Sequence, residues 1–211
     1  MINKMSYDYL IKIIVIGDAN VGKSSIIKVF EDKEWNNDSY ATTIGVEFSS
    51  HHFTIENSIL KMHLWDTAGQ ERFQSITDSY YKHSIGYILV FDLSERETFF
   101  NLKNWKSKID SKCSEKNIGI LVGNKSDLNK EVSKDEIAEF VKDNNLIYIE
   151  TSAKKNINID SIFKLLINEI YNKFVVKEEM IDGIRKNQYI NLSEFNYNNY
   201  SYNIYDCCNI I

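Results

Sequence analysis

A glycine-rich stretch near the amino terminus has the residue types and spacing of a phosphate-binding loop. Residues 17–24 read Gly-Asp-Ala-Asn-Val-Gly-Lys-Ser and match the pattern G-x-x-x-x-G-K-[ST]. In such a loop, backbone N–H groups point at one anion, the lysine adds a positive charge, and the hydroxyl can bind Mg²⁺. The alternative is a surface turn that contains two glycines and a lysine by chance.

The flanking residues place this loop between a strand and a helix. Leu10 to Ile16 is an apolar, β-branched run typical of a buried strand, and Ser25 to Phe30 has the pattern of a helix start. This order directs backbone N–H groups and a helix N-terminus at one point, which attracts an anion. We therefore predict a nucleoside phosphate site. Its expected residues are Gly17, Asp18, Ala19, Asn20, Val21, Gly22, Lys23, Ser24 and Ser25.

Apolar runs that alternate with helical patterns predict an α/β domain with a mostly parallel sheet. Gly45 to Ile55 and Ile59 to Trp65 flank the turn-like residues 56–58 and predict a β-hairpin. We expect six strands, one of them antiparallel in the hairpin, and about five helices around them. Three further strands, covered on both faces, are expected at Tyr87–Phe91, Ile118–Val122 and Leu146–Ile149.

Helix starts and one helical stripe are also visible in the sequence. Ser94 and Ser133 each stand three residues before a glutamate, which predicts two capping boxes. Apolar residues from Ile159 to Phe174 recur at helical spacing, which predicts that the last helix packs one face on the sheet.

Three polar clusters follow predicted strands. Residues 66–71 read Asp-Thr-Ala-Gly-Gln-Glu, residues 124–127 read Asn-Lys-Ser-Asp, and residues 151–154 read Thr-Ser-Ala-Lys. Taken alone, Asn-Lys-Ser-Asp is a good turn sequence. Ligands of parallel sheets, however, bind beyond the carboxyl ends of the strands, so these clusters and residues 17–24 are expected to form one site.

Composition excludes several classes of protein. The 211 residues are 43% hydrophobic and 26% charged, with a net charge of −5, which argues against a nucleic-acid partner. No apolar run approaches the length of a membrane span, and residues 1–8 lack the apolar segment of a signal peptide, so we expect a cytosolic chain. Cys113 is expected to be an ordinary thiol, whereas the adjacent Cys207 and Cys208 need an explanation other than a disulfide.

The order of these motifs resembles that of the Ras-type small GTPases, over roughly Leu10 to Phe174. Residues 44–48 (IGVEF), 61–73 (KMHLWDTAGQERF) and 89–94 (LVFDLS) resemble the Rab branch closely. The resemblance implies a P-loop small G domain that binds Mg²⁺, alternates between GTP and GDP, hydrolyses GTP slowly and regulates vesicle traffic. Two alternatives remain: a different P-loop enzyme such as an ATPase, and a slowly or non-hydrolysing GTP-binding scaffold on membranes.

At the base, the resemblance implies that the Asp127 carboxylate accepts two hydrogen bonds from guanine. Asn124 would join this loop to the phosphate loop, and the Ala153 N–H, between Ser152 and Lys154, would meet the guanine carbonyl oxygen. Lys125 and Trp35 would cover the faces of the base. Trp35 could instead be a core or partner-binding aromatic.

At the phosphates, the resemblance implies that Ser24 and Thr43 ligate Mg²⁺ and that Asp66 orients a magnesium-bound water. The Gly69 N–H would contact the γ-phosphate, and Gln70 would position the attacking water. Loss of the γ-phosphate would then release residues 36–46 and 68–82, which is the switch.

The resemblance also implies partners. These are an exchange factor, a GTPase-activating protein that supplies an arginine, a GDP-dissociation inhibitor or escort protein, and effectors. Three features depart from the Rab pattern: one extra residue before Ile44, a side chain at Ala19 beside the expected path of that arginine, and Lys82-His83-Ser84 after Tyr81.

Three segments are expected: an extension at residues 1–9, the G domain at 10–176, and a tether at 177–211 that is rich in Asn and Tyr. The end, Cys-Cys-Asn-Ile-Ile, resembles a prenylation motif. The tether has no basic patch and one lipid anchors only marginally, so we expect lipids on both Cys207 and Cys208. The expected location is the cytoplasmic face of intracellular membranes, with a soluble cytosolic pool.

Overall fold

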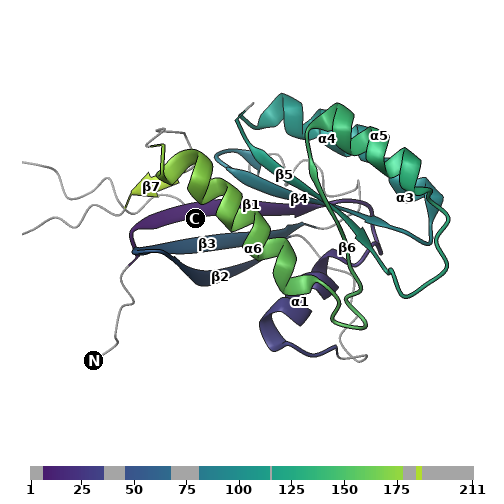
Figure 1. Cartoon of the computed structure of the whole chain (residues 1–211), viewed down its shortest axis with the longest axis horizontal. Coiled ribbons are helices and arrows are strands. Elements are labelled where there is room, and N and C mark those ends of the chain that lie inside the picture. Colours follow the sequence, from purple (N-terminus) through teal and green to yellow (C-terminus); the bar gives the residue numbers. More distant parts are fainter. Residues whose placement is uncertain (1–6, 36–45, 68–80, 115, 178–183, 187–211) are drawn as a thin grey trace, which may run out of the picture.

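One mixed β-sheet with helices on both faces forms the centre of the structure (Figure 1). This computed structural model describes residues 7–35, 46–67, 81–114, 116–177 and 184–186. The strand order is β2-β3-β1-β4-β5-β6, and neighbouring strands are parallel except for the β2–β3 hairpin. The predicted fold class is therefore confirmed. The strands are β1 (Tyr9–Ile16), β2 (Val46–Ile55), β3 (Ser58–Thr67), β4 (Gly86–Asp92), β5 (Ile118–Asn124) and β6 (Ile147–Glu150).

Five α-helices lie within the described residues, as the sequence predicts. They are α1 (Lys23–Asp32), α3 (Arg96–Phe100), α4 (Leu102–Lys112), α5 (Lys134–Asn144) and α6 (Ile159–Ile170). A π-helical turn, η3 (Tyr171–Val175), continues α6. In the part of the chain that the structure describes, no helix has the length and apolar content to cross a bilayer.

The burial of β1 on both faces explains why its sequence is apolar except at Lys12. Ile11 and Ile13 belong to the core cluster shared with α1 and α6, whereas Ile14 and Ile16 belong to the cluster shared with α3, α4 and α5. All four side chains are fully buried. A strand covered on both faces has apolar residues at most positions, with no polar–apolar alternation.

Of the two predicted capping boxes, one forms and one does not. The Ser133 side chain accepts from the Glu136 N–H, and the Glu136 side chain accepts from the Ser133 N–H, so that box is confirmed. The box predicted at Ser94 is wrong, because the Ser94 hydroxyl donates to Asp92 Oδ1 at 2.7 Å and α3 begins after Glu95 instead. The charged Asp92 carboxylate gives that hydroxyl a charge-assisted hydrogen bond, in place of the bond that it would accept from a helix N–H.

A short seventh strand lies in the segment expected to be a tether. β7 (Ile184–Lys186) pairs antiparallel with β1, placing Ile184 beside Ile11 and Lys186 beside Tyr9. β3 pairs with one edge of β1 from Tyr9 to Val15, so β7 pairs with the other edge. On that edge β4 pairs with β1 only from Ile13 onward, and β7 pairs with the residues before it. Residues 184–186 thus form a strand inside the segment expected to be a tether, whereas residues 178–183 and 187–211 lie outside the described residues. Three residues are too short for a periodic signal, and the free edge of β1 provides the pairing.

Helix α6 offers a test of core packing with a matched control. Leu166 is fully buried against the sheet, whereas its neighbour Leu165 is 39% exposed. We expect Leu166→Ala to lower the free energy of unfolding by about 2–5 kcal/mol, because it leaves a cavity. Leu165→Ala should cost less than about 1 kcal/mol. Urea unfolding measures both, and equal losses would contradict the assignment of the buried stripe.

Candidate functional site

The loop between β1 and α1 depends on two glycines. Gly17 has a φ of 143°, and a Cβ there would lie 2.1 Å from the Val90 carbonyl oxygen. Gly22 has a φ of 96°, and a Cβ there would lie 2.3 Å from Asn124 Nδ2. Both the backbone angle and the close neighbours exclude a side chain. The loop is therefore pressed against β4 and β5, with its backbone at the carboxyl ends of the strands.

Lys23 begins α1 and is almost fully buried. Its Nζ donates to two carbonyl oxygens of the loop, Gly17 at 3.0 Å and Asp18 at 2.6 Å. Burial lowers the pKa of Lys23 to about 8, and the negative charges of Asp66 and Asp18 oppose this shift. No acidic residue lies in the first turn of α1. The helix N-terminus and this ammonium group together suit an anion.

Asp66, near the end of β3, is the second buried charge. Its exposure is 3%, and neither carboxylate oxygen has a hydrogen bond of ordinary geometry among the described residues. Burial raises the pKa of Asp66 to about 6, although the Ser24 hydroxyl and the Lys23 charge act in the opposite direction. A buried carboxylate so poorly satisfied is costly in a protein interior. Carboxylate and hydroxyl oxygens are Mg²⁺ ligands, so Asp66 and Ser24 fit a magnesium site.

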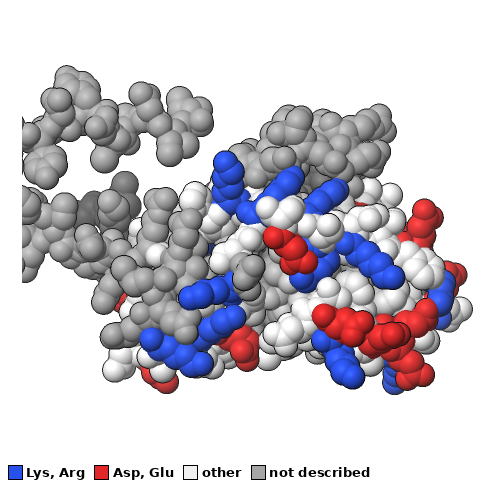
Figure 2. Space-filling view, turned by 90° about the horizontal axis from the view of Figure 1, so that it is seen from above, with Lys and Arg blue, Asp and Glu red and all other residues white. Residues whose placement is uncertain are grey.

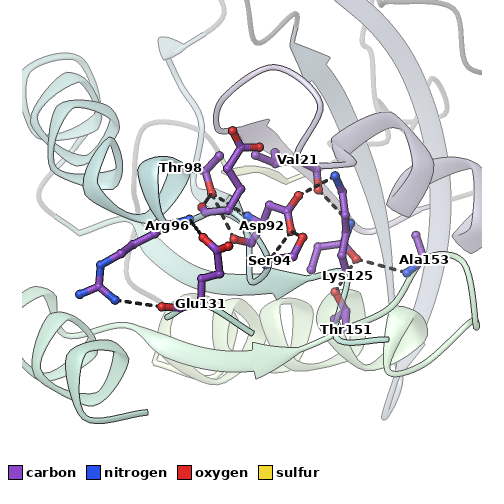
Figure 3. Close-up of polar contacts among 11 residues, drawn as sticks. Val21, Asp92, Ser94, Arg96, Thr98, Lys125, Glu131, Thr151 and Ala153 are labelled. Atoms are coloured by element: carbon purple, nitrogen blue, oxygen red, sulfur yellow. Dashed lines mark hydrogen bonds and ion pairs between the residues drawn. The ribbon is translucent and has the colours of Figure 1, made fainter. Parts of the chain in front are cut away.

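Asn124, the last residue of β5, joins three segments at this end of the sheet. Its Nδ2 donates to the Val21 carbonyl oxygen at 2.9 Å. Its Oδ1 accepts from Thr151 Oγ1 at 3.1 Å and from the Ala153 N–H at 3.2 Å (Figure 3). The resemblance implies that the Ala153 N–H donates to the guanine carbonyl oxygen. In the structure this N–H donates to Asn124 Oδ1. The loops at residues 17–22, 124–127 and 151–154 are thus held together by one buried amide.

Asp127 and Ser152 connect two of these loops. Ser152 Oγ donates to Asp127 Oδ1 at 2.5 Å and accepts from the Lys155 N–H at 3.1 Å. The Ser126 N–H donates to the Thr151 carbonyl oxygen at 2.9 Å. These bonds fix the Asp127 carboxylate at the mouth of the site.

Asp92 is a site residue to which the sequence analysis gave no role. Lys125 Nζ lies 2.6 Å from Asp92 Oδ2, and Asp92 Oδ1 accepts from the Ser94 N–H and hydroxyl (Figure 3). Asp92 is 2% exposed, so this ion pair restrains the Lys125 side chain. The signal was present, because Asp92 is a polar residue at the end of a buried strand, as Asp66 and Asn124 are.

The side chain of Asp18 points away from the loop that it belongs to. Its two carboxylate oxygens accept from Trp105 Nε1 at 2.7 Å and Asn101 Nδ2 at 2.8 Å. The carboxylate therefore fixes the loop to the start of α4, and only the Asp18 backbone is left for an anion. Spacing alone could not reveal this, since Trp105 is more than 80 residues away in the chain.

Other predicted residues are placed only in part. Trp35 is half-buried and packs against the core cluster on the α1 side of the sheet. This contact suits the alternative in which Trp35 is a core aromatic, and its stacking on the base stays a prediction. Ala19 is half-buried, and Asn20 is exposed with a φ of 64°. Thr43, Gly69, Gln70, Cys207 and Cys208 lie outside the described residues.

The fold and the site define a P-loop nucleotide-binding protein, with the phosphate loop, the buried lysine and carboxylate, and a second polar loop at one end of a parallel sheet. The model of the Ras family matches residues 12–172. Ras-related protein RABA1h of Arabidopsis thaliana is 37% identical over 179 residues, which cover 84% of this chain and 81% of that protein. The chain belongs to the Ras family, as a small GTPase of the Rab type.

The two buried charges predict the pH dependence of nucleotide binding. An anion needs protonated Lys23 (pKa about 8), and Mg²⁺ needs ionised Asp66 (pKa about 6). We expect the affinity for GDP with Mg²⁺ to be greatest between about pH 6 and 8, and to fall by up to about tenfold per pH unit on either side. Equilibrium titration with a fluorescent GDP derivative measures this.

The control is Lys23→Arg, which keeps its charge at high pH. Its affinity is expected to lose the decline above pH 8 while it keeps the decline below pH 6. A wild-type affinity that stays constant from pH 7 to pH 10 would show that the Lys23 charge does not set the binding.

Proposed function

We propose that this chain is a molecular switch that binds GTP and GDP, hydrolyses GTP and regulates traffic between intracellular membranes. One observation carries the proposal: the Asn124 side chain joins the phosphate loop at Val21 to the loops of Asp127 and Ala153. This bond supports the proposal, because it holds the loop of Asp127 at a fixed position relative to the phosphate loop. A P-loop alone would support any nucleotide.

Asp127 selects guanine. Its carboxylate accepts hydrogen bonds from the N1–H and the 2-amino group, two donors that adenine lacks. An adenine nucleotide would leave a carboxylate without partners, a mismatch that costs a factor of about 10⁴ or more. Lys125, restrained by Asp92, covers one face of the base, and Trp35 covers the other.

At the phosphate end, Lys23 exchanges its two carbonyl partners for the β- and γ-phosphates. Ser24 and Thr43 hold Mg²⁺, and Asp66 orients one of its waters. The bound ion neutralises charge on the phosphates. The negative charge of Asp66 opposes the lowering of the Lys23 pKa, which supports this arrangement.

Gln70 positions the water that attacks the γ-phosphate, and Thr43 and Gly69 depend on that phosphate for their position. The segments at residues 36–46 and 68–82 therefore change when it leaves. Hydrolysis is slow alone, because Lys23 is the only basic residue of the phosphate loop and the transition state needs a further positive charge. An activating protein supplies it, and the Ala19 methyl limits its approach.

The hairpin between the two switch segments supports effector binding. Phe48 is 51% exposed, and its ring centroid lies 5.1 Å from that of Trp65 and 4.9 Å from that of His63. An exposed aromatic group on a rigid sheet is a favourable anchor for a protein partner. Exchange factors and inhibitors recognise the same segments, and lipids on Cys207 and Cys208 attach the chain to the membrane.

Base selectivity gives the first test. We expect the wild-type chain to prefer GTP over ATP by about 10⁴ or more, and Asp127→Ala to reduce this preference to about tenfold or less. Asp143→Ala removes an exposed carboxylate of α5 and should leave the preference unchanged. Competition binding measures all three. A wild-type preference for ATP would replace the proposal with an ATPase or a kinase.

Single-turnover hydrolysis gives the second test. We expect the wild-type chain to convert bound GTP slowly, and an activating protein to accelerate the conversion. Gln70→Ala should lower the rate about a hundredfold or more while the affinity for GDP stays within about threefold. GTP that remains intact with and without an activating protein would favour a non-hydrolysing scaffold, which Ala19 makes the second candidate.

A further inference from the structure

The direction of β7 decides at which end of the sheet this strand finishes. The strands β1, β4 and β5 all begin at one end of the sheet, which we call the strand-start end. The candidate nucleotide site lies at the other end, where these strands finish. Because β7 is antiparallel to β1, it runs from Ile184, beside Ile11, to Lys186, beside Tyr9. β7 therefore ends at the strand-start end, away from the nucleotide site (Figure 1).

The β7 pairing is supported by side-chain packing as well as by backbone bonds. Ile184 is half-buried and packs against the core cluster that contains Ile11 and Phe174. β4 pairs with β1 only from Ile13 onward, so the residues of β1 before it have a free edge on that side. The pairing with β7 supplies hydrogen-bond partners to this edge from Tyr9 to Ile11. An unpaired strand edge readily accepts another extended segment, so the tail occupies a place where the fold favours one.

Lysines gather at the same end of the sheet. Lys82 precedes β4, Lys112 and Lys116 precede β5, and Lys173 lies in η3. Lys173 Nζ donates to the Lys116 carbonyl oxygen at 3.1 Å, and Lys112 Nζ lies 5.4 Å from the centroid of the Tyr81 ring, next to Lys82. These contacts join the end of α6 to the starts of β4 and β5 in one basic rim.

The nearest described carboxylates mostly have partners. Asp110 pairs with Lys106 at 2.5 Å, Glu56 accepts from the Tyr171 hydroxyl, and Asp8 accepts from the Ile59 N–H. Glu169 is exposed one turn before Lys173. Figure 2 looks onto the side of the molecule that α4 and α5 cover in Figure 1, with Lys and Arg side chains over its centre and left and a group of Asp and Glu side chains at its right. Charges of opposite sign are thus separated on this side, although the chain has a net charge of −5.

We propose that β7 is a clip that holds the lipid-bearing tail on β1 and turns the strand-start end of the sheet toward an anionic phospholipid bilayer. The proposal rests on the proposed lipid attachment at Cys207 and Cys208. Lysines of the rim then lie near the lipid headgroups, where each contributes a modest attraction. The nucleotide site and the Phe48 surface face the cytosol, where regulators and effectors reach them.

The clip is tested in solution, without lipid or nucleotide. In hydrogen exchange of the full chain, we expect the amides of residues 184–186 to exchange about tenfold or more slowly in the wild type than in Ile184→Asp. Ile181→Asp adds the same charge three residues earlier and should leave this protection unchanged. Equal exchange in the wild type and Ile184→Asp would overturn the clip.

The orientation is tested on vesicles of equal parts phosphatidylcholine and phosphatidylserine. The full chain is coupled to maleimide lipids through Cys207 and Cys208, which react before Cys113 because burial raises the pKa of the Cys113 thiol to about 11. Lysine acetylation is then mapped by mass spectrometry. We expect Lys82 and Lys116 to react several-fold more slowly on vesicles than in solution, and Lys103 and Lys134, near the nucleotide site, to react as in solution.

The Ile184→Asp variant should lose the protection of Lys82 and Lys116 on the same vesicles, whereas Ile181→Asp should keep it. Equal protection of both ends, or protection of Lys103 and Lys134 alone, would overturn the orientation. Since neither measurement needs GTP or natural lipidation, their failure is distinguishable from failure of the proposed switch, which the hydrolysis assay reports.

Discussion

The Asn124 side chain is the interaction on which the rest of the site depends. It is 1% exposed, and its amide donates to the phosphate loop while its oxygen accepts from two residues of the loop after β6. A buried amide with one of these partners missing would carry an unsatisfied group, which costs about 1–3 kcal/mol. The three loops are therefore stable together in one arrangement. That arrangement fixes the phosphate loop relative to the loops of residues 124–127 and 151–154.

Two buried charges, Lys23 and Asp66, are kept close to each other at this end of the sheet at the cost of desolvation. Their pKa values move toward neutrality from opposite sides, Lys23 down to about 8 and Asp66 up to about 6. Shifts of this kind gather at functional sites, because a ligand of opposite charge can relieve each penalty. In the proposed function, a phosphate group relieves the penalty of Lys23 and a magnesium ion relieves that of Asp66.

The sheet separates the two tasks of the molecule. Parallel strands bring every chemical motif to their carboxyl ends, as the topology requires. The starts of the same strands carry β7 and the basic rim. In this arrangement β1 contributes to both ends, since the phosphate loop follows Ile16 and the β7 pairing covers Tyr9 to Ile11.

The sequence by itself determined the strands, the order of the motifs and the family, because these depend on local patterns: apolar runs, glycines at fixed spacing, and polar residues directly after strands. Only the tertiary structure decided which partner each polar group takes. Asp18 turns to Trp105, Ser94 bonds to Asp92 instead of capping α3, and Ile184 returns to the edge of β1. Asp18 and Ile184 take partners that are distant in the chain, whereas Ser94 takes the buried carboxylate two residues before it. The distant partner wins where burial excludes water, and burial is a property of the folded chain as a whole.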